Sequence, residues 1–265
     1  MKRVLVVLLA FAGLASAASA QTPLIVTDRP DQTESAATVP VGALQLEAGG
    51  LSERSAVPGG RQDSQSWGAI LARYGLHPRL EARLGFAGWQ RTVVSTVSTG
   101  GATDGIGDLE AGVKLGLLST TGGVALAILA STTVPAGTDA YSSGRLDPRT
   151  RLALAVPLTS RLSFGVNAGV FWSSSGPAPA PVVTRSDALY TAVLGFGVTD
   201  RVSAFAESFG SLPVSSGGAS EHLLDGGITV LLSPTLQLDA SGGIGIHADA
   251  PDWFVGAGVS VRLGR

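Results

Sequence analysis

Residues 109–118 read LEAGVKLGLL, and in this stretch apolar side chains alternate with polar or small ones at every second position. A period of two is typical of a β-strand with one apolar and one polar face, because successive side chains of a strand point to opposite sides. The same alternation recurs at 188–198 and 255–263. Such segments exceed the roughly five or six residues usual in soluble sheets and match membrane-spanning strands of about 9–11 residues.

Segments of this kind follow one another from Val41 to the end of the chain. We expect twelve strands, at 42–52, 66–76, 80–91, 107–118, 123–134, 148–158, 161–172, 187–198, 201–210, 221–232, 235–246 and 253–264. After the first twenty residues, no stretch approaches the roughly 18 consecutive apolar residues of a membrane-spanning helix. The predicted fold is therefore all-β, a transmembrane antiparallel up-and-down β-barrel of about 12 strands.

The connections between these strands alternate in length. Five short turns are expected at 77–79, 119–122, 159–161, 199–201 and 233–235. Six longer loops rich in Gly, Ser, Pro and Asp are expected near 53–65, 92–106, 135–147, 173–186, 211–220 and 247–252. Short periplasmic turns and longer extracellular loops are typical of outer-membrane barrels. All 14 prolines precede the first strand, lie in connections or stand at strand ends, as sheet hydrogen bonding requires.

The polar face of each strand is expected to line the lumen, because an outer-membrane barrel is apolar outside and polar inside. The lumen is predicted to carry the following charged side chains: Glu47, Arg73, Glu81, Arg83, Glu110, Lys114, Arg149, Arg151, Glu207, Asp225, Asp239 and Arg262. Six are cationic and six are anionic. We therefore expect Arg–carboxylate pairs across a narrow lumen, and weak selectivity between ions of opposite sign.

The first residues, MKRVLVVLLAFAGLASAASA (1–20), have the features of a bacterial export signal. A basic start is followed by an apolar run too short to span a bilayer, and Ala18-Ser19-Ala20 forms a cleavage site. The mature chain is predicted to begin near Gln21, with a periplasmic segment at 21–41 and the barrel at 42–265. The expected location is the bacterial outer membrane.

Composition excludes several classes of protein. The chain of 265 residues is 45% hydrophobic and 14% charged, and it contains 36 glycines and no cysteine. Disorder and Cys-based zinc or thiol chemistry are therefore excluded. The net charge of −2 predicts no nucleic-acid partner. The sequence offers no phosphate-binding loop or dinucleotide fingerprint, so no cofactor and no metal site is predicted.

Three stretches resemble a known family. TDRPDQTES (27–35), VPVGALQLEAG (39–49) and GIGDLEAGVKLGLL (105–118) are similar to sequences of the meta-pathway phenol-degradation family of outer-membrane transporters. The resemblance covers most of the mature chain, and its most distinctive part is the TDRPD start. It implies uptake of aromatic or other hydrophobic compounds, and it does not imply an enzyme.

The segment before the barrel has two interpretations. Asp28, Arg29 and Asp31 give it charges that can pair with the lumen wall, so the segment can fold inwards as a plug. Alternatively, it is a periplasmic tail that covers the base of the barrel. The sequence does not distinguish these two arrangements.

The expected function is a passive outer-membrane channel for small, hydrophobic or aromatic solutes. Its expected partners are outer-membrane lipid, the solute and the barrel assembly machinery, and it is expected to be a monomer or a small homo-oligomer. One alternative is a secreted or periplasmic β-sandwich that binds a ligand, since such a sandwich also has one polar face per strand. A second alternative is a barrel enzyme that uses Glu221 and His247, which strand pairing places near each other at the outer rim.

Overall fold

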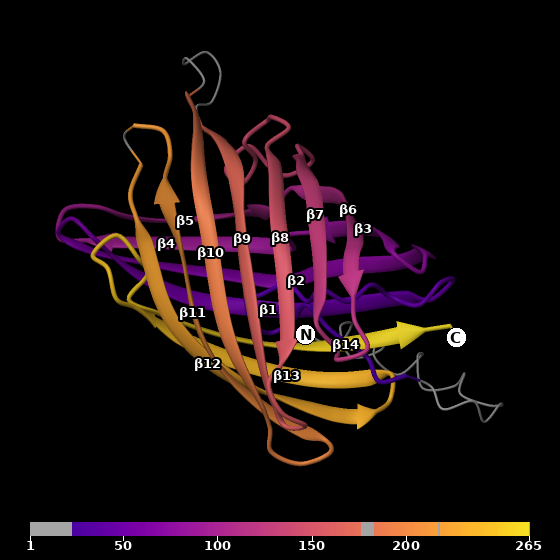
Figure 1. Ribbon diagram of the computed structural model, residues 1–265. Helices are drawn as coiled ribbons and strands as arrows, with labels where there is room; N and C mark the ends of the chain where they lie inside the picture. Colours follow the sequence, from indigo (N-terminus) through magenta and orange to yellow (C-terminus); the bar gives the residue numbers. More distant parts are fainter. Residues whose placement is uncertain (1–22, 176–182, 217, 265) are drawn as a thin grey trace, which may run out of the picture.

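The computed structural model describes residues 23–175, 183–216 and 218–264. One antiparallel sheet closes on itself, because β1 pairs with β14 on one side and with β2 on the other (Figure 1). The strands are β1 (Leu44–Val57), β2 (Gly60–His77), β3 (Leu80–Phe86), β4 (Trp89–Thr96), β5 (Gly100–Ile106), β6 (Leu109–Ser119), β7 (Ala125–Val134), β8 (Pro148–Pro157), β9 (Leu162–Ser175), β10 (Val183–Gly197), β11 (Val202–Pro213), β12 (Glu221–Ser233), β13 (Leu236–Gly245) and β14 (Trp253–Leu263).

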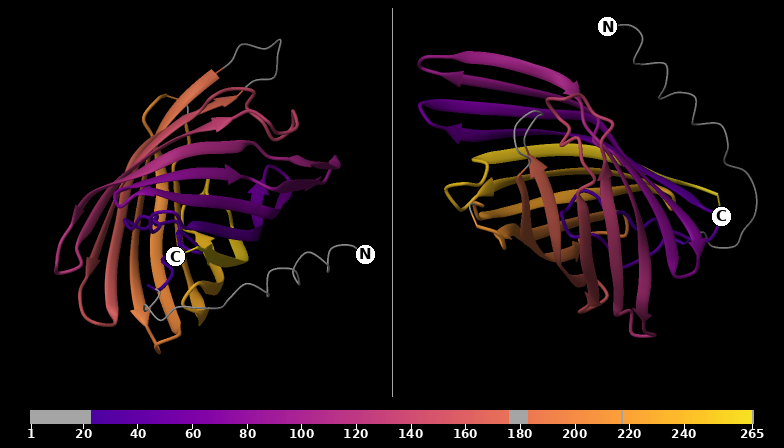
Figure 2. Two further views of the ribbon diagram at one scale, coloured as in Figure 1. Left: turned by 90° about the vertical axis from the view of Figure 1, so that its right-hand side faces the viewer. Right: turned by 90° about the horizontal axis from the view of Figure 1, so that it is seen from above.

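The closed ring contains twelve strands, as predicted, and the alternative of a β-sandwich is wrong. β4 and β5 are continuations of β3 and β6 beyond this ring. β2 pairs with β3 over its second half and with β4 over its first half, while β3 pairs with β6. Each continuation begins after a short break, at Ala87-Gly88 and at Gly107-Asp108. The β1–β2 and β4–β5 hairpins therefore project from one end of the barrel (Figure 2, right).

Two predicted loops are wrong. Residues 53–65 and 92–106 are mostly strand, and the chain reverses in tight turns at Pro58-Gly59 and at 97–99. Gly59 has a φ of 72°, a conformation that favours glycine. These segments lie on the projecting hairpins, where both faces meet solvent, so they lack the apolar alternation that indicates a strand in sequence. The five short turns predicted at the other end are present.

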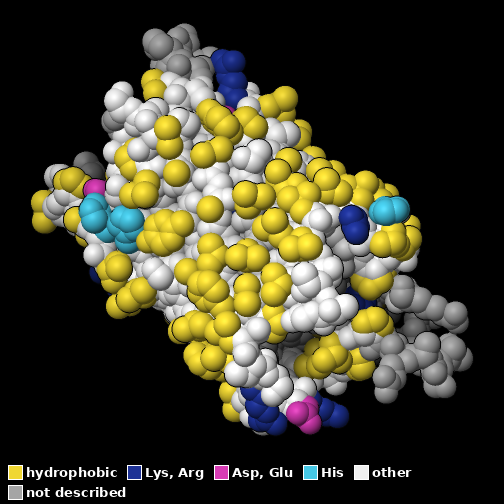
Figure 3. All heavy atoms as spheres, viewed as in Figure 1, with side chains coloured by type: hydrophobic (Ala, Val, Ile, Leu, Met, Phe, Trp, Pro, Cys, Tyr) yellow, Lys and Arg dark blue, Asp and Glu magenta, His cyan; other side chains and the backbone are white. Residues whose placement is uncertain are grey.

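The distribution of side chains is the reverse of that in a water-soluble protein. Apolar side chains cover the outer wall of the barrel, and the charged side chains visible in Figure 3 lie towards its ends. The largest fully buried side chains are instead polar: Arg73, Lys114, Gln45, Glu47, Glu81, Asn167 and Ser260. Among the described residues, no helix is long and apolar enough to cross a membrane.

Tryptophans lie on the outer wall towards the end with the projecting hairpins. Trp67 is directly paired with Trp89, so the two side chains share a face, and both are exposed. An unbroken strand over 80–91, with Glu81 and Arg83 facing inwards, would turn Trp89 into the lumen. The break at Gly88, with a φ of 81°, shifts the alternation, so that expectation is wrong. Arg54 Cζ lies over the Trp253 ring, 5.3 Å from the ring centroid. Aromatic residues at this height are typical of a membrane interface.

Replacing Ile228 with arginine tests the orientation of the wall. Ile228 is 50% exposed in the middle of β12. A charge facing lipid near the bilayer midplane should cost roughly 2–4 kcal/mol of folding free energy. Val97→Arg is the control, because Val97 is 95% exposed in the turn between β4 and β5. Urea unfolding in lipid vesicles checks both variants, and equal stability of the two would contradict this membrane placement.

Candidate functional site

The N-terminal segment, defined here as residues 23–41, lies inside the barrel (Figure 2, left). Its hydrogen bonds and ion pairs reach strands on all sides of the lumen: β1, β2, β3, β6, β8, β9, β10, β11, β13 and β14. A periplasmic tail outside the barrel could not make these contacts. The lumen is therefore lined by strand side chains and crossed by this segment.

Asp28 is the most heavily bonded residue of the segment. Its carboxylate accepts hydrogen bonds from Lys114 Nζ at 2.9 Å and from an Arg83 guanidinium nitrogen at 2.6 Å. An Arg73 guanidinium nitrogen lies 3.2 Å away, and the Ser35 backbone N–H donates to the same carboxylate at 2.8 Å. Burial alone would raise the pKa of Asp28, but the charges of Arg73, Lys114 and Arg83 outweigh it and hold this pKa well below its usual value.

Arg73 connects the same cluster to the barrel wall. Its guanidinium donates to Glu47 at 2.8 Å and to Glu81 at 2.8 and 3.0 Å. It also donates to the backbone carbonyls of Val26 and Ala37, both in the N-terminal segment, at 3.1 Å. The barrel wall and the N-terminal segment together therefore provide acceptors for the N–H groups of the Arg73 guanidinium. Such hydrogen bonds and ion pairs offset the free-energy cost of burying its charge.

Arg29 is held by the adjoining part of the wall, formed by β1, β14 and β13. One guanidinium nitrogen donates to Asp239 at 3.0 Å. The guanidinium lies over Gly49 and Gly258, which are direct partners across β1 and β14. A Cβ atom at either glycine would come within about 2.5 Å of the guanidinium, so the close approach requires glycine at both positions.

Residues 32–36 bind a third part of the wall. The backbone N–H of Gln32 donates to Glu207 at 2.7 Å, and the Thr33 hydroxyl donates to the other Glu207 oxygen at 2.5 Å. Glu34 and Asn167 exchange two hydrogen bonds, of 2.8 and 3.1 Å, through the Glu34 backbone and the Asn167 amide. Ala36 is buried against inward-facing alanines and Leu129 of β7 and β8.

The twelve strand charges selected from sequence are distributed unevenly among these contacts. Glu47, Arg73, Glu81, Arg83 and Lys114 lie together around Asp28. Glu207, Asp239, Arg151 and Arg262 each contact the segment separately, with Arg151 donating to the Gln32 carbonyl and Arg262 to the Pro23 and Leu24 carbonyls. Arg149 and Glu110 pair with each other at 3.5 Å. Neither oxygen of Asp225 accepts a hydrogen bond from an N–H or hydroxyl group in the part of the chain that the structure describes.

Sequence reasoning missed Glu34, Asn167 and Thr191. Glu34 forms an ion pair with Arg83 at 2.6 Å, and Thr191 bonds to Thr33 at 2.6 Å. Asn167 is the only asparagine of the chain and stands in the inward phase of β9, which was the available signal. Glu34 belongs to the same TDRPDQTES stretch as Asp28 and Arg29. Among the described residues, no group of His, Asp and Glu side chains is placed to hold a metal ion.

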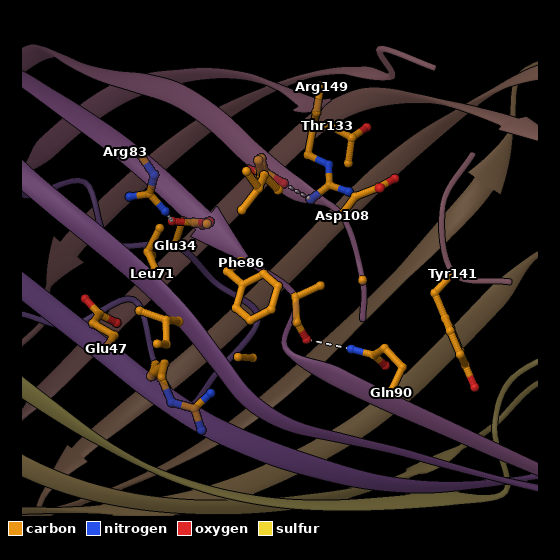
Figure 4. A pocket seen from close by; sticks show the side chains of 18 residues that line it. Glu34, Glu47, Leu71, Arg83, Phe86, Gln90, Asp108, Thr133, Tyr141 and Arg149 are labelled. Atoms are coloured by element: carbon orange, nitrogen blue, oxygen red, sulfur yellow. Dashed lines mark hydrogen bonds and ion pairs between the residues drawn. The ribbon is translucent and has the colours of Figure 1, made fainter. Parts of the chain in front are cut away.

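A cavity of about 570 Å³ opens between the segment and the wall formed by β2, β3, β6 and β8 (Figure 4). Arg29 and Glu34 of the segment line it, together with Leu71 of β2. Tyr141, from the loop between β7 and β8, also lines it, so the cavity lies on the extracellular side of the segment. A small organic molecule fits a cavity of this size.

Apolar side chains also face the lumen, on the other side of the barrel. Leu223 and Phe254 are buried there with Ala250, and Leu51 and Phe209 pack against them. Phe209 and Phe254 form an edge-to-face pair with centroids 6.1 Å apart. These residues stand near the extracellular ends of β11, β12 and β14, above Glu207 and Asp225. The extracellular half of the lumen therefore has an apolar patch.

Comparison with known proteins identifies the family. The sequence model described as "Putative MetA-pathway of phenol degradation" matches residues 27–263. The chain belongs to this family. The match begins at Thr27, so it includes the TDRPD motif that lies inside the lumen. No curated protein matches the sequence.

Solved structures similar to this chain are outer-membrane barrels. The COG4313 outer membrane channel from Pseudomonas putida F1 has a TM-score of 0.67 at 15% identity, with 86% of this chain and 97% of that chain covered. The translocator domain of autotransporter NalP from Neisseria meningitidis has a TM-score of 0.60 at 14% identity, with 83% and 88% covered. The NanC porin has a TM-score of 0.55 at 10% identity, with 83% and 100% covered. This member of the phenol-degradation family is thus an outer-membrane β-barrel.

The docking of the N-terminal segment inside the barrel should depend on pH, because Asp31 titrates. Burial raises the pKa of Asp31 well above its usual value, and the negative charges of Glu207, Asp28 and Asp225 raise it further. The docked segment therefore binds this proton more tightly than a released segment does, so falling pH favours docking. We expect single-channel conductance to fall as the pH drops through the raised pKa of Asp31.

Asp31→Asn should weaken this pH dependence. A smaller pH dependence should remain because burial also raises the pKa of Glu34. Protonation of Asp28 acts in the opposite direction, but it begins only in stronger acid because the pKa of Asp28 is low. Planar-bilayer recordings of both proteins at several pH values check the prediction. The same pH profile in the two proteins would show that Asp31 plays no part.

Proposed function

We propose that the protein is a passive outer-membrane channel for small, hydrophobic or aromatic solutes. The fold and the family support this proposal, as does the name of the similar COG4313 outer membrane channel. The observation that carries it is the apolar patch inside the lumen. An ordinary porin has a polar lumen. Here Phe209, Leu223 and Phe254 form an apolar surface, and a hydrophobic solute lowers its free energy when it moves from water onto this surface.

We also propose that the N-terminal segment is a plug. It occupies the interior and ties opposite walls of the barrel together through Asp28, Arg29 and Glu34. A solute therefore has to pass a closed centre, and the segment must shift for large openings to form. The buried charge network keeps the closed arrangement in one register, since each ion pair is lost if the segment slides.

No catalytic role is proposed. Among the described residues, no ion pair joins Glu221 to His247, the pair suggested at the rim. His247 Nδ1 lies 3.6 Å from Asp249 instead, and the His247 ring meets the His222 ring edge-to-face. His247 is partly exposed at the outer surface. Association with the barrel assembly machinery and the oligomeric state remain predictions from the sequence.

The test compares phenol with glycerol in vesicles whose outer leaflet is lipopolysaccharide, which slows the unassisted passage of phenol. Vesicles with the protein should take up phenol several-fold faster than empty vesicles, while glycerol uptake changes less. The Phe209→Ser/Phe254→Ser double variant should lose most of the phenol gain. A channel that accelerates glycerol and phenol equally, with no effect of the double substitution, would contradict the proposed preference.

A further inference from the structure

The charges inside the lumen do not balance once the N-terminal segment is included. The strands contribute six cations and six acids, and the segment adds Arg29 against Asp28, Asp31 and Glu34. These groups amount to seven cations and nine acids, and Asp108 and Asp187 are two further buried acids. The cations gather around Asp28 and Glu34, as the ion pairs show. The unbalanced acids lie on the other side, on β11 and β12.

Glu207 and Asp225 are the centre of this acidic region. They are direct partners across β11 and β12, and both are almost fully buried. Glu207 accepts hydrogen bonds from Gln32 and Thr33 of the segment, but no N–H or hydroxyl group of the described residues donates to either oxygen of Asp225, whose neighbour is the Glu207 carboxyl group. No ion pair joins either carboxylate to a cationic side chain among the described residues. Two facing carboxylates in such a place must share a proton or hold a cation.

Aromatic rings lie beside this pair of acids. Phe254 lies over Gly243, the direct partner of Asp225 on β13: a Cβ at Gly243 would meet Phe254 Cε1 at 2.5 Å and Asp225 Cβ at 2.6 Å. The Phe254 ring and the Asp225 side chain are therefore neighbours above Gly243, and Phe209 packs edge-to-face against Phe254. A carboxylate beside aromatic faces is the environment that attracts an organic ammonium group, through charge and through cation–π contact.

We propose that this region binds solutes that carry a protonated amine on a small apolar or aromatic body. The ammonium group pairs with Asp225 and Glu207, and the apolar body lies on Phe209, Phe254 and Leu223. The Asp225 oxygens are out of contact with solvent, so the Phe254 ring turns aside when the ligand enters. A metal ion is a poorer occupant, since no metal-binding group of three side chains is found among the described residues. This inference rests on the proposed function, because the solute must reach the lumen.

The experiment titrates the purified full-length protein in detergent with three probes of the same size. They are benzylammonium, neutral benzyl alcohol and anionic benzoate. Because its ammonium group forms a charge-assisted hydrogen bond that the alcohol cannot form, benzylammonium should bind at least about tenfold more tightly than benzyl alcohol. Benzoate should bind most weakly. Calorimetry gives the three dissociation constants.

Asp225→Asn should bring the affinities for benzylammonium and benzyl alcohol close together, and the β-sheet circular-dichroism spectrum of the variant checks that it is folded. Asp104→Asn is the matched control, since Asp104 is an exposed acid on the projecting β4–β5 hairpin that pairs with Arg91. It should keep the preference for benzylammonium.

Two negative results have different meanings. If benzyl alcohol and benzylammonium bind equally to the unaltered protein, the acids only share a proton and the ammonium site is refuted, while a channel for neutral aromatics stands. If none of the three probes binds and phenol uptake is also unassisted, the proposed function itself fails. A preference for benzylammonium that survives Asp225→Asn would place the cation elsewhere and overturn the assignment to β12.

Discussion

Replacing Asp28 with asparagine is expected to destabilise the folded protein by about 3–5 kcal/mol, the usual cost of removing one partner from a buried ion pair. Lys114 would lose its ion-pair partner, and Arg73 and Arg83 would each lose one of theirs. The side chains of Lys114 and Arg73 are at most 1% exposed, so water cannot replace the carboxylate without opening the site. The segment should therefore dock more weakly, and single-channel conductance should rise.

The matched control for Asp28→Asn is again Asp104→Asn. The Arg91–Asp104 pair is about 3.1 Å long and largely exposed, and exposed pairs contribute only about 0–1 kcal/mol. Urea unfolding in lipid vesicles and planar-bilayer conductance measure the two variants side by side. If Asp28→Asn were as stable and as poorly conducting as Asp104→Asn, the cluster around Asp28 would not hold the segment.

Deleting residues 23–38 should produce the largest increase in conductance, several-fold or more. The deletion removes every segment side chain that crosses the lumen, from Asp28 to Glu34. The twelve strands keep their own pairing, which the segment does not supply. Conductance in planar bilayers should therefore approach that of an unobstructed barrel of this size, which is intermediate between filled eight-stranded and open 16-stranded barrels.

A second variant separates occlusion from chain length. Replacing 28–35 with a Gly-Ser stretch keeps the segment but removes its charged contacts, so conductance should also rise, with more fluctuation than in the deletion. The free energy of unfolding should fall in both variants, because Arg73, Arg83 and Lys114 lose their counter-charges. Unchanged conductance in the deletion would mean that the lumen is closed by something other than the segment.

The barrel could be predicted from sequence because a lipid-facing wall imposes strict alternation on each strand. In β6, every second residue from Leu109 faces lipid, while Glu110 and Lys114 face the lumen. The prediction was wrong where that constraint is absent. The projecting ends of β1, β2, β4 and β5 meet solvent on both faces, so 53–65 and 92–106 resembled loops. The break at Gly88 then reversed the phase of Trp89.

The partners within the lumen were less predictable than its lining. The inward phase of Arg73 and Lys114 follows from strand periodicity, but their convergence on Asp28 depends on where a chain segment some 45 or more residues away in sequence enters the barrel. Periodicity carries no information on that path, which is why plug and tail both stayed open. The lack of a hydrogen-bond donor to Asp225 among the described residues could not be predicted either. Strand periodicity shows which charged side chains face inwards, but it does not show which of them form ion pairs or hydrogen bonds.

The chain has no cysteine, which allows the segment to be locked in place without interference. The Thr33 and Thr191 hydroxyl oxygens are 2.6 Å apart, one on the segment and the other on β10. This proximity makes Thr33→Cys/Thr191→Cys a suitable pair for a disulfide between plug and wall. Reduction should free the segment, while a single Thr191→Cys substitution controls for the effect of the reductant.

The most direct test of the account measures phenol uptake by vesicles with a lipopolysaccharide outer leaflet that contain this double-cysteine protein. Oxidised protein should take up phenol little faster than empty vesicles, and reduction should restore uptake to the rate of the unaltered channel. The single-cysteine protein should be fast under both conditions. Equal, rapid phenol uptake by the oxidised and reduced double variant would contradict a channel in which solutes pass only when the N-terminal segment moves.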